Sequence, residues 1–323
     1  MPRKRPKGVI GVGWACFASS VLGRTEHVPM SEDYPDTVVR RTFFEAGGDL
    51  GWRLSALETP REGFTRWKIV VITGSPSWAE YWAPVLAALP QDREMVVVDR
   101  PGFGASQPDD HVPDLETQAL ALSPLLKAKP GQKILLVGQS YGAAIATLMA
   151  RLNPRRVRGL VLLSGYYAEP GPTARWLLDA GGKALGIIPR DLRNAVLEVT
   201  GQPAQFDTVR QALAQLDLPI HVVHGDKDDF APLEAAERLV AETRPRRSMR
   251  FARVDGADHF LNDGPTEVLL EALDECLPPP LRLPAWRLPK VELPDFAALA
   301  PSLRNLRLWP QPAPRRGMKT ADA

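Results

Sequence analysis

The chain has 323 residues, of which 44% are hydrophobic and 24% are charged, with 40 Lys and Arg against 38 Asp and Glu. This composition excludes an intrinsically disordered chain, a collagen-like repeat and a miniature fold held together by disulfides. The formal net charge of +2 is too small to indicate a nucleic-acid-binding surface. Two cysteines, Cys16 and Cys276, are too few for a disulfide framework or a four-thiolate zinc site.

The N-terminus combines a basic stretch, residues 2–7, with an uncharged apolar stretch, residues 9–22. This pattern is typical of a bacterial export signal. As a helix the apolar stretch would span about 21 Å, short of the roughly 30 Å hydrocarbon core, which favours a cleaved signal or a shallow anchor over a membrane span. We therefore expect residues 1–35 to be a leader and linker of an exported or cell-envelope protein. A basic arm packed on a cytoplasmic domain is the alternative.

Residues 36–279 have the length and the pattern of one α/β domain. Several of its short apolar runs are hydrophobic almost throughout, as in strands of a parallel sheet that is covered by helices on both faces. We predict a mostly parallel eight-stranded sheet flanked by helices. The expected strands are residues 38–44, 52–57, 68–72, 95–98, 134–137, 160–163, 220–223 and 249–254, and the expected helices are residues 80–89, 115–126, 141–152, 233–242 and 266–276.

Proline is in clear excess, with 32 residues of 323 against an ordinary share of about 5%. Ten of the prolines lie in residues 278–314, where their spacing excludes a helix or a central strand of any length. We therefore predict that residues 280–323 form a Pro-rich tail. Its role stays open between a solvated extension and docking to the domain, to a partner or to a membrane surface.

A candidate nucleophile lies where the expected strand 134–137 runs into the next helix, at Ser140 in the sequence Gly138-Gln139-Ser140-Tyr141-Gly142. A serine at the apex of so sharp a turn needs small residues two positions before and after it, so that the two backbones can pass each other. The pentapeptide alone is a weak signal, but the strand before it and the helix rich in small residues after it strengthen the interpretation.

A serine nucleophile needs a base, and the chain has five histidines. His27 precedes the domain, and His111 lies among acidic residues in a loop. His221 and His224 fall within or at the end of an expected strand, where a structural role is favoured. His259 follows the last expected strand in a glycine-containing loop, and it is the candidate base.

The third residue of such a site is a carboxylate that orients the imidazole. Three acids, Asp226, Asp228 and Asp229, directly follow the expected strand 220–223. The chain order of serine, aspartate and histidine matches the order described for hydrolases of this architecture. Spacing from Gly225 favours Asp228, and Asp226 and Asp229 remain candidates.

Five segments resemble the α/β-hydrolase fold superfamily, in the branch with a serine nucleophile, over about residues 36–279. The resemblance implies that Ser140 is the nucleophile, His259 the general base and Asp228 the orienting acid. The segments are residues 73–76 with Trp82 further on, 99–106, 138–142, 224–228 and 256–259.

The resemblance also implies an oxyanion hole formed by the backbone N–H groups of Ser75 and Tyr141. In the family this segment usually reads histidine-glycine-x-proline, whereas Thr73 occupies the histidine position here. The donors do not depend on the histidine ring, but the support that the ring gives to the loop is in question.

Two features bear on the substrate. Trp78, Tyr81 and Trp82 follow the oxyanion segment, and either line an apolar acyl or alcohol pocket or pack in the core. Residues 166–217 separate the sixth and seventh strands and resemble a small lid, with helical patterns at residues 174–185 and 191–200. The apolar face of this segment would close over a hydrophobic substrate.

We therefore expect a serine hydrolase, esterase- or lipase-like, that cleaves a carboxylic ester or a related acyl compound through an acyl-enzyme on Ser140. The alternatives are an acyltransferase, perhydrolase or carbon–carbon hydrolase with the same residues, and a non-catalytic ligand-binding protein on a hydrolase fold. The expected partner is a small hydrophobic molecule, with possible association of the N-terminus or tail with a membrane surface. The sequence predicts no metal site, no cofactor and no nucleic-acid partner.

Overall fold

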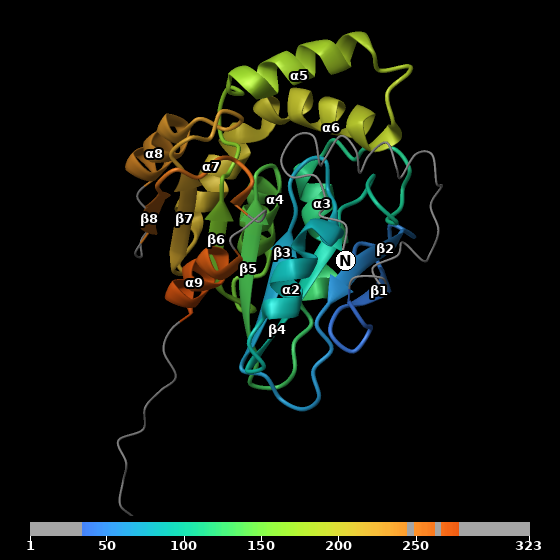
Figure 1. The fold of residues 1–323 in the computed structure, drawn as a ribbon, viewed down its shortest axis with the longest axis vertical. Coiled ribbons are helices and arrows are strands. Elements are labelled where there is room, and N and C mark those ends of the chain that lie inside the picture. Colours follow the sequence, from blue (N-terminus) through green and yellow to red (C-terminus); the bar gives the residue numbers. More distant parts are fainter. Residues whose placement is uncertain (1–33, 244–248, 262–265, 278–323) are drawn as a thin grey trace, which may run out of the picture. The chain divides into compact units, whose positions relative to one another are not determined.

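The computed structural model describes residues 34–243, 249–261 and 266–277 (Figure 1). The chain divides into two units, residues 1–278 and 279–323, and every described residue lies in the first. The predicted leader up to residue 33 and the predicted Pro-rich tail lie outside the described residues. No described helix combines the length and the apolar character that crossing a membrane requires.

The centre of the fold is an eight-stranded sheet with the order β1-β2-β4-β3-β5-β6-β7-β8 (Figure 1). β2 runs antiparallel to both of its neighbours, and every other neighbouring pair is parallel. The predicted mostly parallel sheet is thus confirmed. Its strands are β1 (Arg40–Glu45), β2 (Arg53–Glu58), β3 (Trp67–Ile72), β4 (Arg93–Asp99), β5 (Lys133–Gln139), β6 (Val157–Leu163), β7 (Ile220–Gly225) and β8 (Met249–Val254).

The central strands are apolar on both faces because helices cover both sides of the sheet. Along β5, Ile134 and Leu136 pack in one hydrophobic cluster, and Leu135 and Val137 pack in the other. This division follows from the alternation of side chains along a strand. The first cluster lies under α3 (Leu115–Ala121), α4 (Gly142–Leu152), α7 (Phe206–Gln215) and α8 (Leu233–Glu242), and the second under α2 (Ala83–Ala88) and α9 (Thr266–Cys276).

Two predicted helices are shorter than expected, and one helix was not predicted. The expected helix 115–126 is divided into α3 and a 3-10 turn, Ser123–Leu126, with Pro124 at the start of the turn, where a proline suits a first turn and not a helix interior. The expected helix 80–89 likewise begins as a 3-10 turn, Ala79–Trp82, before α2. Helix α7 falls within the segment 166–217 that was predicted as a lid. It buries Val209 and Leu213 in the core and contacts α4, so it belongs to the layer on the sheet.

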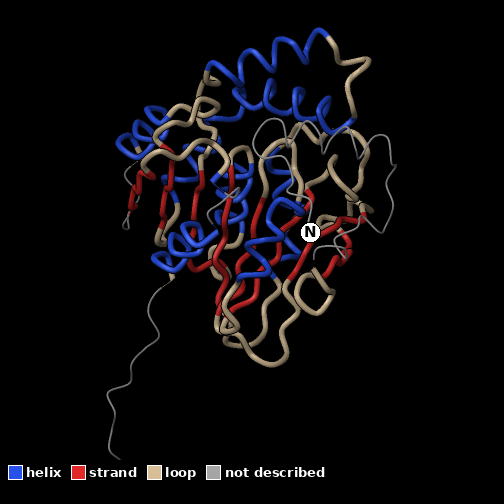
Figure 2. Tube along the Cα trace, in the orientation of Figure 1, coloured by secondary structure: helices blue, strands red, loops and turns tan. Residues whose placement is uncertain are grey.

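The remainder of that segment contains α5 (Pro172–Lys183) and α6 (Arg190–Gly201), which together we call the helical insertion. Both helices lie beyond the carboxyl ends of the parallel strands, and α6 is the nearer of the two to the sheet (Figures 1 and 2). Ligands of parallel α/β sheets bind at this edge. The helical insertion therefore covers the edge of the sheet where the predicted site residues follow their strands.

Candidate active site

Ser140 lies at a sharp turn between β5 and α4, with a φ of +52°. This left-handed conformation is energetically unfavourable for a residue with a side chain, and it places Ser140 at the turn, outside both β5 and α4. The turn requires glycine at position 142, because a Cβ there would lie 2.3 Å from the carbonyl oxygen of Ile72. At Gly138 a Cβ would lie 2.6 Å from the Cα of Ala143, so the strand and the helix pass each other at backbone contact.

Three predicted residues form a continuous chain of hydrogen-bonding contacts at this edge of the sheet. The distance from Ser140 Oγ to His259 Nε2 is 2.9 Å, and that from His259 Nδ1 to Asp228 Oδ2 is 2.8 Å. Ser140 follows β5, Asp228 follows β7 and His259 follows β8. The His259 ring stacks on Phe230, with ring centroids 5.2 Å apart, and Phe260 meets it edge-on. The two aromatic rings therefore limit the orientations open to the imidazole.

Asp228 is fully buried as a side chain and remains a carboxylate. Burial by itself raises its pKa, but hydrogen bonds from His224 and His259 and from the backbone of Ala231 more than offset this effect, so the pKa lies well below its usual value. Oδ1 accepts the N–H groups of Phe230 and Ala231 at 3.0 and 2.8 Å. These two bonds fix the carboxylate with Oδ2 turned towards His259.

The other two candidate acids have different partners. Asp226 accepts the N–H of Gly256 at 2.6 Å, and Asp229 accepts the hydroxyl of Thr173 on the helical insertion. Neither of them contacts His259. The structure thus brings Asp228 alone, of the three acids, to the candidate base.

His224 is a second histidine beside the carboxylate. Its Nε2 lies 2.7 Å from the carbonyl oxygen of Ala231 and 3.2 Å from Asp228 Oδ2. Since the carbonyl oxygen can only accept, Nε2 carries a proton and faces both oxygens. The structural role that the sequence suggested for His224 therefore includes direct contact with the candidate orienting acid.

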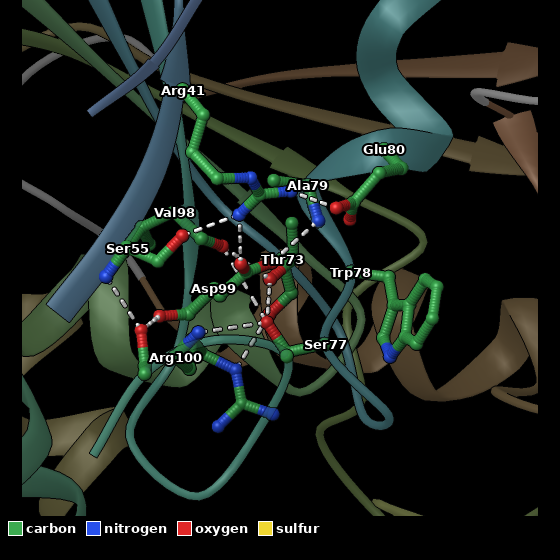
Figure 3. Close-up of polar contacts among 12 residues, drawn as sticks. Arg41, Ser55, Thr73, Ser77, Trp78, Ala79, Glu80, Val98, Asp99 and Arg100 are labelled. Atoms are coloured by element: carbon green, nitrogen blue, oxygen red, sulfur yellow. Dashed lines mark hydrogen bonds and ion pairs between the residues drawn. The ribbon is translucent and has the colours of Figure 1, made fainter. Parts of the chain in front are cut away.

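The predicted oxyanion segment, residues 73–76, is held by the hydroxyl groups of Thr73 and Ser77, with no histidine ring (Figure 3). Thr73 Oγ1 donates to the carbonyl oxygen of Val98 at 3.0 Å and also pairs with the hydroxyl of Ser77. Ser77 Oγ in turn accepts the backbone N–H of Arg100 at 2.9 Å. Thr73 and Ser77 thus attach the segment to the end of β4. These bonds support the loop in the absence of a histidine ring.

Asp99, the last residue of β4, extends this support to the adjoining elements (Figure 3). Its carboxylate accepts the N–H of Ala79 at 2.9 Å and pairs with Arg41 at 2.8 Å. The Arg41 guanidinium also pairs with Glu80 and with the hydroxyl of Ser55. The start of the 3-10 turn is therefore fixed to β1, β2 and β4 by a network of charges that is almost completely buried.

Arg100 and Glu198 form a bidentate ion pair, and both side chains are fully buried. Their two N–O distances are each 2.9 Å. Gln118 contacts both members, and the hydroxyl of Ser75 donates to Glu198 at 2.8 Å. Arg100 also donates to the carbonyl oxygen of Gly74 at 2.7 Å. Glu198 belongs to α6, so this pair joins the helical insertion to the oxyanion segment.

The two sides of α6 carry different residues. Asp191, Asn194 and Glu198 recur at helical spacing, are buried, and bond to the domain below: Asp191 accepts the indole N–H of Trp78 at 2.9 Å, and Asn194 donates to the carbonyl oxygen of Gly102 at 2.7 Å. An adjacent side of the helix is apolar and faces a cavity. Its residues are Leu192, Ala195, Val196 and Val199.

A cavity of 480 Å³ opens over Ser140 and His259, between the sheet edge and the helical insertion. Trp78, Tyr81 and Trp82, predicted as pocket or core residues, all line it, and Trp82 is also fully buried. None of the described lining residues is Lys, Arg, Asp or Glu. The cavity is lined by residues 73–76, 78, 81, 82, 139–141, 166, 174, 176–178, 180, 181, 184, 188, 192, 195, 196, 199, 230, 259 and 260.

Comparison with known proteins agrees with this geometry. A family profile described as alpha/beta hydrolase fold matches residues 69–193. Solved structures with this fold include an esterase from Thermogutta terrifontis, with a TM-score of 0.56 at 21% identity over 73% of this chain and 97% of that one. The chain has the α/β-hydrolase fold.

Two further proteins are similar to this chain. The esterase RhEst1 from Rhodococcus sp. ECU1013 has a TM-score of 0.56 at 19% identity over 72% of this chain and 97% of its own. A 2-hydroxy-6-oxononadienedioate/2-hydroxy-6-oxononatrienedioate hydrolase from Pseudomonas putida is 27% identical over 226 residues, covering 54% of this chain and 75% of the relative.

Sequence reasoning missed several residues around Ser140. Phe230 and Phe260 directly follow the aspartate and histidine motifs, and this adjacency is a signal that would have found them. Tyr166, Trp176 and Glu198 come from the connection between β6 and β7, where no motif marks individual positions. Among the described residues, no group of three or more His, Cys, Asp and Glu is placed to hold a metal ion.

Proposed function

We propose that the chain is a serine hydrolase that cleaves neutral, apolar carboxylic esters through an acyl-enzyme on Ser140. The observation that carries the proposal is the hydrogen-bonded chain of Ser140, His259 and Asp228 at the floor of the apolar cavity. A base in contact with the nucleophile and an acid in contact with the base are the arrangement that activates a serine.

In the proposed acylation step, Ser140 Oγ attacks the carbonyl carbon of the ester while His259 Nε2 takes the hydroxyl proton. Asp228 holds the proton on Nδ1 and stabilises the imidazolium that forms. The N–H groups of Ser75 and Tyr141 are the proposed donors to the oxyanion, and Tyr141 directly precedes the first turn of α4, where the helix dipole favours negative charge. The tetrahedral intermediate collapses, and the alcohol leaves with the proton from His259.

Deacylation uses the same residues in reverse. His259 removes a proton from a water molecule, which attacks the ester carbonyl of the acylated Ser140. The second tetrahedral intermediate releases the carboxylic acid, and the proton returns to Ser140 Oγ. Each step therefore conserves atoms and charge without any group beyond the substrate, water and the three side chains.

A carbon–carbon hydrolase is the second candidate, because several relatives carry the name of such an enzyme. The name of the Pseudomonas putida relative specifies a dioate, a compound with two carboxylates. Burying a carboxylate without a cationic partner is costly, and the described cavity lining offers no Lys or Arg. Arg100 is fully engaged with Glu198 and does not line the cavity. The uncharged lining therefore favours a neutral ester.

A serine-directed fluorophosphonate probe tests the nucleophile, with Ser164→Ala as the matched control at another buried serine. The wild type and S164A are expected to be labelled, and Ser140→Ala is expected not to be. Labelling that S140A leaves unchanged would refute the proposed role of Ser140. Turnover of neutral p-nitrophenyl esters against an anionic 2-hydroxy-6-oxo-dienoate then separates the two candidate functions. Faster cleavage of the dienoate would favour the second, and tight ligand binding without any turnover would favour a non-catalytic binding protein.

A further inference from the structure

Arg100 and Glu198 lie immediately behind the proposed oxyanion segment, and the proposed catalytic steps do not use them. Both are fully buried, and both oxygens of the Glu198 carboxylate are occupied. Oε1 accepts from Arg100 Nη1 at 2.9 Å and from Gln118 at 2.8 Å. Oε2 accepts from Arg100 Nη2 at 2.9 Å and from the hydroxyl of Ser75 at 2.8 Å. The carboxylate therefore fixes the guanidinium in one plane.

The guanidinium in turn holds the peptide that carries the Ser75 N–H. Arg100 Nη2 donates to the carbonyl oxygen of Gly74 at 2.7 Å, and Nε donates to that of Thr73 at 2.9 Å. The Gly74–Ser75 peptide bond is trans. In a trans peptide the C=O and the N–H point to opposite sides of one rigid plane. Holding the carbonyl oxygen at Arg100 therefore directs the Ser75 N–H away from Arg100.

The proposed nucleophile lies directly beside this segment. A Cβ placed on Gly74 would lie 3.0 Å from Ser140 Cβ and 3.5 Å from Ser140 Oγ, so the segment passes directly beside the serine. Ser75 and Ser140 both line the cavity, whereas Arg100 does not. Within the described residues, the Ser75 N–H donates to no other protein group.

We infer that Arg100 and Glu198 are positioning residues, which orient the Ser75 N–H for the oxyanion and thereby make the oxyanion hole depend on the seating of α6. The inference rests on the proposed function. Glu198 is a residue of the helical insertion that contacts both Arg100 and the hydroxyl of Ser75. Displacement of α6 removes the Glu198 carboxylate from Arg100 and frees the Gly74–Ser75 peptide to rotate.

The variant Glu198→Gln tests this role. Each carboxylate oxygen accepts two hydrogen bonds, so the amide NH₂ group must face a guanidinium N–H whichever way the Gln is turned. Loss of an entire oxyanion donor costs on the order of 10² to 10³ in rate. A donor that is misdirected and not removed is expected to lower kcat by about 10- to 100-fold. KM is expected to change by less than about twofold, because the cavity lining is untouched.

Asn194→Ala is the matched control. Asn194 lies on the same side of α6 and donates to the carbonyl oxygens of Gly102 and Asp109 at 2.7 and 2.9 Å, but it does not contact the oxyanion segment. It is expected to lower the Tm without lowering kcat by more than about threefold. If E198Q does not fold, the double variant Arg100→Met with Glu198→Leu removes both buried charges, and the same fall in kcat is expected.

The measurements are kcat and KM on a p-nitrophenyl ester, and inhibition by an alkyl trifluoromethyl ketone, whose adduct with Ser140 carries an oxyanion. Inhibition is expected to weaken by the same factor as kcat. A folded E198Q or double variant with kcat within threefold of wild type would overturn the inference and leave the proposed function standing. An equal loss in N194A would overturn the positioning role assigned to Arg100 and Glu198, since the effect would then reflect general loosening of α6 and not the loss of this ion pair. A wild type without Ser140-dependent turnover would overturn both.

Discussion

Replacement of Asp228 by Asn has an effect that follows atom by atom from the hydrogen bonds of the carboxylate. Oδ1 accepts two backbone N–H groups, at 3.0 and 2.8 Å, and Oδ2 faces His259 Nδ1 at 2.8 Å. In Asp228→Asn the two backbone donors select the amide oxygen for the Oδ1 position, so the NH₂ group replaces Oδ2. His259 Nδ1 must then accept a hydrogen bond, which leaves the proton on Nε2. In this tautomer His259 cannot take the proton of Ser140.

The magnitude follows from this change of tautomer. Loss of the correct tautomer lowers kcat by about 10⁴ in a serine hydrolase, which corresponds to about 5 kcal/mol in the activation free energy. KM is expected to change little, because Asp228 does not line the cavity. Steady-state kinetics on p-nitrophenyl butyrate and the rate of fluorophosphonate labelling would measure the loss.

Asp226→Asn is the control for this substitution. Asp226 precedes Asp228 by two residues and accepts the N–H of Gly256 at 2.6 Å, a bond that an amide oxygen retains, and it does not contact His259. The control is expected to keep kcat within about threefold. A D228N variant with more than a tenth of the wild-type kcat would refute the reasoning, as would an equal loss in D226N.

Two further predictions concern stability and loop support. Because the pKa of Asp228 is depressed in the folded chain, its contribution to stability is complete above the ordinary Asp pKa of about 3.9 and is lost as the pH falls through the folded-state pKa. Urea unfolding should therefore show wild type losing stability relative to D228N below about pH 4, by at most about 1.4 kcal/mol per pH unit, and parallel curves would contradict the assignment. Thr73→Val removes the bond to the Val98 carbonyl oxygen and is expected to cost about 1 kcal/mol in unfolding free energy and up to about tenfold in kcat/KM. Unchanged values of both in T73V would show that the Thr73 hydroxyl does not support the oxyanion segment.

The sheet could be predicted from sequence because its central strands are buried on both faces. A continuous apolar run such as that in β5 is typical of a strand that is buried on both faces of a parallel sheet. The parallel order of the strands then brings Ser140, Asp228 and His259 to one edge of the sheet. Gly138 and Gly142 could also be predicted, because the strand and the helix pass each other so closely that no side chain fits at either position. Patterns that arise from local packing of this kind are visible in a single sequence.

The polar contacts behind the site could not be predicted in the same way. Arg100 and Glu198 are separated by 98 positions in the sequence, and each residue by itself would be predicted to lie exposed at the surface. Their pairing depends on where α6 comes to rest over the sheet, and no local pattern specifies this. The role of Thr73 was obscure for the same reason, since its partner Val98 lies 25 positions away on another strand. Helix α7 was missed although its buried residues, Val209, Ala212 and Leu213, recur at helical spacing, because the whole of residues 166–217 was assigned to a lid.

The two sides of α6 separate substrate choice from the integrity of the fold. Leu192, Ala195, Val196 and Val199 shape the cavity, while Asp191, Asn194 and Glu198 fasten the helix to the domain. Because the two sets alternate along one helix, we expect substitutions at the apolar positions to reshape the cavity and to leave the polar contacts of Asp191, Asn194 and Glu198 in place. A saturation library restricted to those four positions would therefore test how the cavity lining sets the substrate preference of the proposed hydrolase. By the same separation, a single natural substitution at one of these positions would change the cavity while the polar attachment of α6 remains.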